Sequence, residues 1–149
     1  MNKNQQLSVC IVSFNALSYL KKCLKSIYAS KEEVNFEIIM VDNNSEEKNV
    51  LYIRKNFPQI KLIVNKKNIF FAAANNQAFS VAKGEYILML NPDTEIISGT
   101  LTKMVQYLDK KREIGVLGPK LLNYDKTLQC SISNYLTIFD LIREYTFYF

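Results

Sequence analysis

Polar side chains that could bind a ligand follow the apolar runs of this chain, at the points where those runs end. Two of them are the aspartates Asp42 and Asp93, and asparagines cluster beside both. Carboxylate oxygens are the ligands that hard divalent cations prefer, and amides can hydrogen-bond a heterocycle or a ribose. The pattern therefore predicts a site for a nucleotide-like ligand whose phosphates share a metal ion with the protein.

The composition excludes several other chemistries. The 149 residues contain no histidine, which removes the Ser-His-Asp triad, the Cys-His pair and histidine-based zinc or iron sites. The four glycines form neither a G-x-G-x-x-G nor a G-x-x-x-x-G-K loop, which argues against a dinucleotide oxidoreductase and a P-loop ATPase. A diphosphate without such a loop would need a metal ion, and Asp93 is the natural ligand.

The net charge of +5 points to small anionic ligands rather than to nucleic acid. It comes from 19 basic and 14 acidic side chains, without an arginine-rich stripe or interleaved aromatics. Attraction to nucleotide sugars or to lipid headgroups is equally consistent with this charge, so contact with a membrane surface is left open. We expect no nucleic-acid partner.

Short apolar runs alternate with helical patterns along most of the chain. Continuous apolarity is typical of strands that are covered on both faces. The runs of strand length are 7–12, 36–41, 60–64, 86–90 and 114–117, and the helical patterns lie at 17–28, 45–57, 72–82 and 98–108. This order predicts an α/β fold with a doubly wound, mainly parallel sheet in a single domain over residues 1–149.

The helix boundaries follow from polar residues at their starts. Asn15 or Ser18 is the expected N-cap of the first helix, Ser45 opens the second, and Ser98 caps the fourth. The third helix has small residues on its surface, so it can approach the sheet closely. Beyond residue 117 we expect a short hairpin that pairs 120–122 with 128–132.

The last stretch, 135–149, is rich in aromatic residues and suits an amphipathic helix. Three interpretations are open for it: packing on its own sheet, contact with a further part of the protein, or a contact in a homo-oligomer.

No apolar run approaches the roughly 18 residues of a membrane-spanning helix. The three cysteines are widely spaced, which favours a reducing, cytoplasmic location, including the inner face of the membrane.

Five segments together resemble the successive motifs of family 2 glycosyltransferases, and most closely the rhamnosyltransferase-like branch. They occur in the family's order and at its spacing from about residue 7 to residue 131. The segments are VCIVSFN at 9–15, IMVDNNS at 39–45, NIFFAAANNQ at 68–77, NPDT with its preceding leucine at 90–94, and GPKLL at 118–122.

The resemblance implies a GT-A fold and the inverting transfer of a sugar, with rhamnose as the candidate, from a nucleotide diphosphate donor to a polysaccharide or glycolipid precursor. It places a set of polar residues at the nucleotide-sugar site: Ser13 and Asn15 beside the nucleotide, Asp42 facing the base, Asn44 supporting that loop, Asn68 and Asn76 on the donor side, and Asn91 near the ribose or sugar. Asp93 then corresponds to the ligand of Mg²⁺ or Mn²⁺ in the family's D-x-D motif.

The chain departs from the family pattern in two respects. Phe70 and Ala78 stand where glycine is usual, and a phenyl ring could crowd the donor pocket or alter the backbone there. The family's acceptor site and general base lie in a further C-terminal region, so we expect the chain to stop before them and assign no catalytic base. The alternative function is a catalytically incomplete module that binds a nucleotide sugar or a partner.

Simpler structural roles are open for several of these residues. Asp93 could form a turn after Pro92, and Asp42 could cap the following helix. Asn15 could be an N-cap only, and Asn76 could satisfy loop backbone groups. A lysine pair such as Lys66 and Lys67 is usually a solvated surface, and we expect that here.

Overall fold

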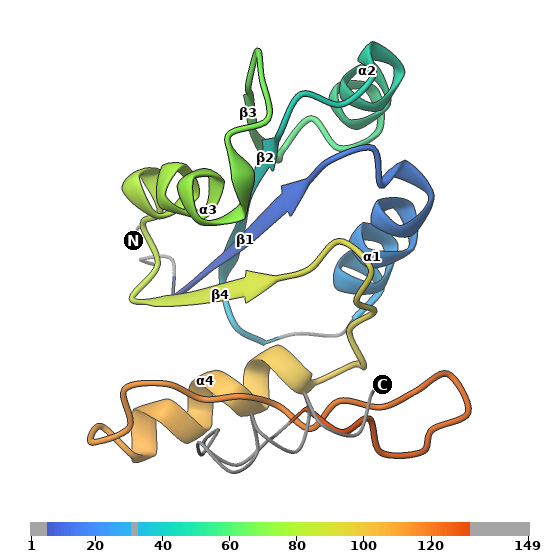
Figure 1. Cartoon of the computed structure of the whole chain (residues 1–149). Coiled ribbons are helices and arrows are strands. Elements are labelled where there is room, and N and C mark those ends of the chain that lie inside the picture. Colours follow the sequence, from blue (N-terminus) through green and yellow to red (C-terminus); the bar gives the residue numbers. More distant parts are fainter. Residues whose placement is uncertain (1–5, 31–32, 132–149) are drawn as a thin grey trace, which may run out of the picture. The chain divides into compact units, whose positions relative to one another are not determined.

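The computed structural model describes residues 6–30 and 33–131, in which strands and helices alternate (Figure 1). The elements, in chain order, are β1 (Leu7–Ser13), α1 (Leu17–Ala29), β2 (Phe36–Asp42), α2 (Glu47–Asn56), β3 (Lys61–Val64), α3 (Phe70–Val81), β4 (Tyr86–Leu90) and α4 (Thr100–Lys110). The predicted α/β class is confirmed, and so is the predicted alternation from β1 to α4.

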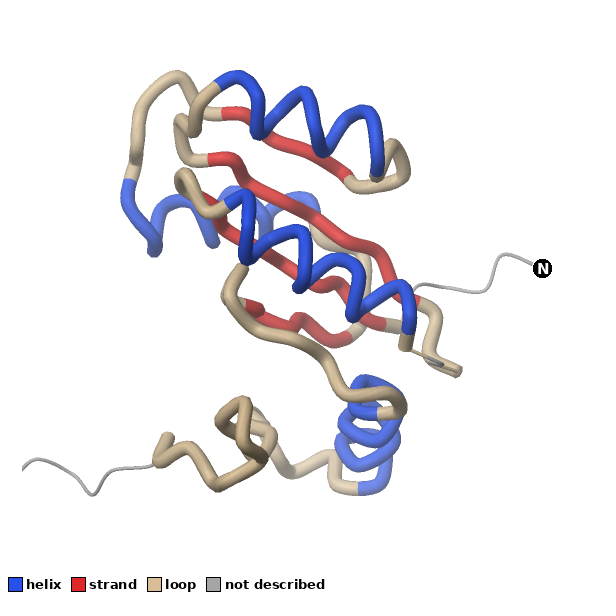
Figure 2. The backbone as a smooth tube through the Cα atoms, turned by 90° about the vertical axis from the view of Figure 1, so that its right-hand side faces the viewer, coloured by secondary structure: helices blue, strands red, loops and turns tan. Residues whose placement is uncertain are grey.

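The four strands lie side by side in one sheet, in the order β3-β2-β1-β4, and all neighbours are parallel (Figure 2). The chain therefore moves outward from β1 through β2 to β3 and then returns to the other side of β1. In parallel α/β sheets ligands bind beyond the carboxyl ends of the strands at such a change of direction. The register brings Ser13 opposite Asp42, at the ends of β1 and β2.

Alternate residues of the central strands pack on opposite faces, because successive side chains of a strand point to opposite sides. Val9, Ile11 and Met40 belong to the cluster that includes the buried positions of α1 and α4 and Ile53 of α2. The other cluster contains Cys10 and Val12, together with Ile39 and Val41 and two alanines of α3. Both faces of β1 and β2 are thus covered.

Helix α3 packs closely on the sheet, as its small residues predict. Ala74 and Ala78 are fully buried against the strands. Ala78 is one of the positions where the family usually has glycine, and its single methyl group fits this contact.

At the amino end of the sheet, Ser8 fixes the turn between α3 and β4. Its hydroxyl donates to Glu37 Oε1 at 2.8 Å and accepts from the Gly84 amide at 2.8 Å. A Cβ on Gly84 would lie 2.5 Å from the Ser8 nitrogen and 2.6 Å from the Leu7 carbonyl carbon. Only glycine allows this close approach of two backbones.

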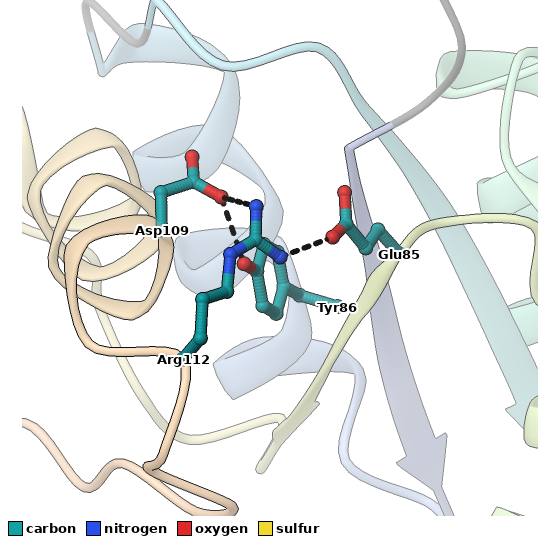
Figure 3. A network of polar contacts seen from close by, with 4 residues as sticks. All are labelled: Glu85, Tyr86, Asp109 and Arg112. Atoms are coloured by element: carbon teal, nitrogen blue, oxygen red, sulfur yellow. Dashed lines mark hydrogen bonds and ion pairs between the residues drawn. The ribbon is translucent and has the colours of Figure 1, made fainter.

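A polar network joins the end of α4 to the start of β4 (Figure 3). Arg112 pairs with Glu85 and, at 2.9 Å, with Asp109, which also accepts a hydrogen bond from the Tyr86 hydroxyl at 2.8 Å. The hydrogen bond to Asp109 raises the pKa of Tyr86. Because these side chains are largely exposed, we assign the network a role in orienting α4 rather than a large contribution to stability.

The chain divides into two compact units, Met1–Gly115 and Val116–Phe149. In the described part of the second unit, residues 116–131, a single antiparallel bridge joins Leu122 to Leu128 around a turn. Asp125 accepts a hydrogen bond from the Thr127 hydroxyl at 2.6 Å, which lowers the pKa of Asp125. The expected hairpin is therefore present in shortened form, and its last expected residue, 132, lies outside the described residues.

The expected strand at 114–117 was wrong. The structure has no strand there, and the side chain of Val116 is 92% exposed. Gly115 interrupts the run and Pro119 lacks an amide, so the segment is a poor partner for a β-ladder. The amphipathic helix expected at 135–149, with its proposed contacts, lies outside the described residues.

The helix starts also differ from the expected ones by one or two residues. The N-caps are Ala16 for α1, Glu46 for α2 and Gly99 for α4, and none makes a side-chain capping hydrogen bond. Within the described ranges, no helix has the length and apolar character needed to cross a membrane.

Candidate functional site

Asp42 ends β2 beside Ser13 and is almost completely buried, with 1% of its surface exposed. Its Oδ2 accepts a hydrogen bond from the Ser45 amide at 2.9 Å, so the simple turn-forming role is real for this oxygen. Its Oδ1 is buried without a hydrogen-bond partner in the described structure. A buried acceptor without a donor is costly and calls for an explanation, and a bound ligand that donates a hydrogen bond is one. Asn49 Oδ1 on α2 is a second such acceptor among the described residues.

Asn15 joins the loops after β1 and β2. Its backbone amide donates to Ser45 Oγ at 2.9 Å, and its side-chain Oδ1 accepts from the backbone amide of Glu46 at 3.0 Å. Asn15, an expected N-cap of α1, instead accepts from the amide of Glu46, the N-cap residue of α2. Asn15 links two loops at the sheet edge, and the sequence could not reveal a partner 31 residues away.

A network of side-chain amides joins the loops after β2 and β3. Buried Asn43 donates to Asn68 Oδ1 at 2.6 Å, and its own Oδ1 accepts from Asn65 at 3.2 Å and from the Ile69 amide at 3.0 Å. Asn65 and Gln77 exchange two hydrogen bonds, of 2.9 and 3.1 Å. Asn68 is among the predicted site residues, whereas Asn43, Asn65 and Gln77 are not. Asn43 and Asn65 follow strand ends, which was a usable signal, but Gln77 lies within α3.

Three residues of these loops adopt left-handed backbone angles: Asn15 at φ 50°, Asn44 at φ 73° and Phe70 at φ 65°. Asparagine tolerates this region, whereas a bulky residue there is strained. Phe70 keeps the angle that favours the family's glycine, because its amide donates to Asn68 Oδ1 at 2.8 Å. Its ring is 80% exposed, so it projects outward from the start of α3. Strain of this kind clusters at functional sites.

Asn91 and Asp93 follow β4 and are exposed. Their loop contacts α1: the Asn91 carbonyl oxygen lies 3.9 Å from Cys23 Sγ, and the Ile96 amide donates to Ser26 Oγ at 2.8 Å. Burial, and then the charges of Asp93 and Glu95, raise the pKa of Cys23 to about 12. Cys23 is therefore a protonated thiol at neutral pH.

The carboxylates of this loop fit a metal ion that is shared with a ligand. Among the described residues there is no group of three or more histidines, cysteines or acids that could hold an ion without help. Mg²⁺ in particular is commonly bound by one or two carboxylates together with substrate phosphates and water. Exposed Asp93, with exposed Glu95 two residues later, matches that donor set.

The hydrogen bonds bring together only part of the expected site. Asn15, Asp42 and Asn68 belong to the connected loops after β1, β2 and β3, and exposed Asn44 lies in the second of these loops. Asn76 is exposed on α3, one position beyond buried Asn75.

The chain matches the family described as Glycosyl transferase family 2 over residues 8–146. EpsE of Bacillus subtilis, which is named as a glycosyltransferase, is 33% identical over 131 residues; the match covers 85% of this chain and 46% of EpsE. The chain thus spans about half the length of that relative.

Solved structures share the fold. S. aureus TarS 1-349, in complex with UDP-GlcNAc, has a TM-score of 0.62 and 24% identity, over 72% of this chain and 32% of TarS. The mannosyltransferase PcManGT of Pyrobaculum calidifontis, in complex with GDP-Man and Mn²⁺, has a TM-score of 0.61 and 21% identity, over 72% of this chain and 33% of its own. The family match covers nearly the whole chain, and the parallel sheet agrees with it: the chain belongs to glycosyl transferase family 2.

Proposed function

We propose that this chain is the donor-binding part of an inverting, metal-dependent glycosyltransferase that uses a nucleotide diphosphate sugar. The observation that carries the proposal is the unpartnered Oδ1 of Asp42, buried beside Ser13 at the carboxyl end of the sheet. The acceptor would be a polysaccharide or glycolipid precursor, and rhamnose is the proposed sugar from the rhamnosyltransferase-like motifs.

Asp42 would recognise the base. Its free oxygen has no donor beside it and can accept a hydrogen bond from an N–H group, which uracil, thymine and guanine all present on their pairing edge. Because Oδ1 is buried, a base reaches it only when the adjoining loop moves aside. Ser13, Asn15 and Asn44 are the proposed neighbours of the nucleotide, and Asn68, Asn76 and Asn91 the proposed contacts on the donor side.

Asp93 would hold Mg²⁺ or Mn²⁺ with the donor's diphosphate, and exposed Glu95, two residues later, adds a second negative charge to the same loop. A bound divalent ion supplies Lewis-acid stabilisation of the departing diphosphate. PcManGT, which shares the fold, was solved in complex with both GDP-Man and Mn²⁺, and this pairing of nucleotide sugar and divalent ion supports the assignment.

In the proposed inverting step, an acceptor hydroxyl attacks the anomeric carbon of the sugar from the side opposite the nucleoside diphosphate, which leaves. That hydroxyl must lose a proton to a general base. No residue of this chain is assigned as that base. The role of this chain is to bind and orient the donor.

The test is a thermal-shift titration of the whole chain with UDP, dTDP and GDP, each with Mn²⁺ and with EDTA. A ligand that binds only the folded state raises the melting temperature, and the rise grows with the logarithm of the ligand concentration relative to Kd. We expect a rise with at least one nucleotide that is larger with Mn²⁺. No shift with any of the three would contradict the proposal.

One observation favours a second function, binding of a nucleotide sugar without transfer: an exposed, strained phenylalanine replaces the usual glycine at residue 70. Incubation with a matching nucleotide sugar separates the two functions. Release of free nucleoside diphosphate, detected by chromatography, supports transfer or donor hydrolysis, whereas binding without release supports the module.

A further inference from the structure

One helix contacts both ends of the loop that carries Asp93. The loop leaves β4 at Asn91, whose carbonyl oxygen faces the Cys23 thiol at 3.9 Å, and the Ile96 amide donates to Ser26 Oγ at 2.8 Å. Cys23 and Ser26 are three residues apart on α1, so they lie on the same side of the helix. Asp93 lies between the two points of attachment.

Ser26 makes the stronger of these two contacts. Its hydroxyl proton is donated to the Cys23 carbonyl oxygen at 2.7 Å, which leaves the oxygen's lone pairs for the Ile96 amide. The side chain of Ile96 packs against the hydrophobic cluster that contains Val9 and Ile11, so this end of the loop is fixed by both a hydrogen bond and apolar contact. The thiol contact at Asn91 is longer, and sulfur is a weak donor.

We infer that Ser26 is a positioning residue for Asp93. The Ser26 hydroxyl holds the 91–96 loop so that the Asp93 carboxylate is ready to share a metal ion with a diphosphate. The inference rests on the proposed function for the role of Asp93 and on the Ser26 hydrogen bonds for its placement. A loop that samples more conformations binds more weakly, in proportion to the fraction that is competent.

The experiment compares the full chain with Ser26→Ala, Ser26→Thr and Ser80→Ala. Threonine keeps the hydroxyl, and Ser26 is half-buried rather than fully enclosed. Ser80 is a matched control, because its hydroxyl donates to the Gln77 carbonyl at 2.8 Å, three residues back in another helix. Two readouts are used: amide hydrogen exchange of residues 91–96 without ligand, and calorimetric affinities for UDP and GDP with MnCl₂ or with EDTA.

In Ser26→Ala we expect the Ile96 amide to exchange about tenfold faster and the Mn²⁺-dependent gain in affinity to fall about tenfold. Nucleotide binding in EDTA should be unchanged, and Ser26→Thr should restore both quantities. A general loss of stability would not change the ratio of affinities with and without Mn²⁺.

Two results would overturn the inference: unchanged exchange at Ile96 in Ser26→Ala, or a Mn²⁺-dependent gain equal to that of the parent. If the parent shows no Mn²⁺-dependent binding, the proposed function fails and the role of Ser26 toward a metal fails with it. In that case the exchange data still show whether Ser26 holds the loop, so the two failures are distinguishable.

Discussion

Only one oxygen of the Asp42 carboxylate accepts a hydrogen bond from the backbone amide of Ser45, at 2.9 Å, while its other oxygen is buried without a donor. One half of the side chain thus shapes the turn before α2, and the other half is left for a ligand. The two roles can be separated by changing the charge without changing the shape.

Asp42→Asn should keep the turn, because the amide oxygen can still accept from Ser45. Removing a buried, half-partnered charge should leave the free energy of unfolding unchanged or raise it by about 1 kcal/mol. Affinity for the nucleotide should fall at least about tenfold, measured by calorimetry beside urea denaturation. Glu46→Gln, a neighbouring exposed acid, is the control; equal losses in both variants would contradict a specific role for Asp42.

Asp93→Asn should remove the advantage of Mn²⁺ over EDTA in nucleotide binding, since a neutral amide is a much weaker ligand for a hard cation. Glu95→Gln removes the same charge two residues away and should keep most of that advantage. Melting temperatures of both variants should match the parent, because both acids are exposed. A metal response that survives in Asp93→Asn but disappears in Glu95→Gln would move the assignment to Glu95.

Phe70→Gly should stabilise the chain by about 1 kcal/mol. It relieves a left-handed angle that costs a non-glycine residue about 1–2 kcal/mol, and the entropy of the glycine offsets part of the gain. Phe71→Gly, at the next position without a positive φ, should instead destabilise by about 1 kcal/mol. Chemical denaturation measures both, and a loss of stability in Phe70→Gly would show that the exposed ring makes contacts of its own.

Gly84→Ala should destabilise by about 3 kcal/mol or more, because the added carbon would overlap the backbone of β1 at Leu7 and Ser8. Gly115→Ala has open space around the corresponding position and serves as the control. Thermal melts of the two variants should differ by more than 5 °C, given the roughly 2–8 °C per kcal/mol of domains of this size. Equal melting temperatures would mean that the close approach at Gly84 relaxes easily.

Stability should fall in alkali, because the cysteine thiols of the unfolded chain lose their protons at a lower pH than the buried thiols of the folded chain. Burial raises the pKa of Cys10 to about 11 and of Cys23 to about 12, above the 9.0 of an exposed thiol. The unfolded chain therefore releases these protons first, so the contribution is complete below pH 9.0 and declines as the pH rises toward 11 and 12. Cys23→Ser should show a shallower decline in urea denaturation between those limits, and an identical slope would contradict this account.

The sequence predicted the sheet well because its strands are continuous apolar runs with polar residues at one end. That pattern placed Ser13 and Asp42 at neighbouring strand ends, where the register confirms them. Local patterns could not assign partners: Asn15 bonds the second helix instead of the first, and Asn43 selects Asn65 and Asn68 from several nearby amides. The run at 114–117 was apolar enough for a strand, but apolarity does not supply a neighbouring strand to pair with.

The connections among the loops after β1, β2 and β3 are made by amides and a serine hydroxyl, groups that neither gain nor lose protons in the physiological range. With no histidine anywhere in the sequence, these loops also lack the side chain that most often converts a change between pH 5 and 8 into movement. The hydrogen bonds that join these loops to one another should therefore be insensitive to acidity over that interval.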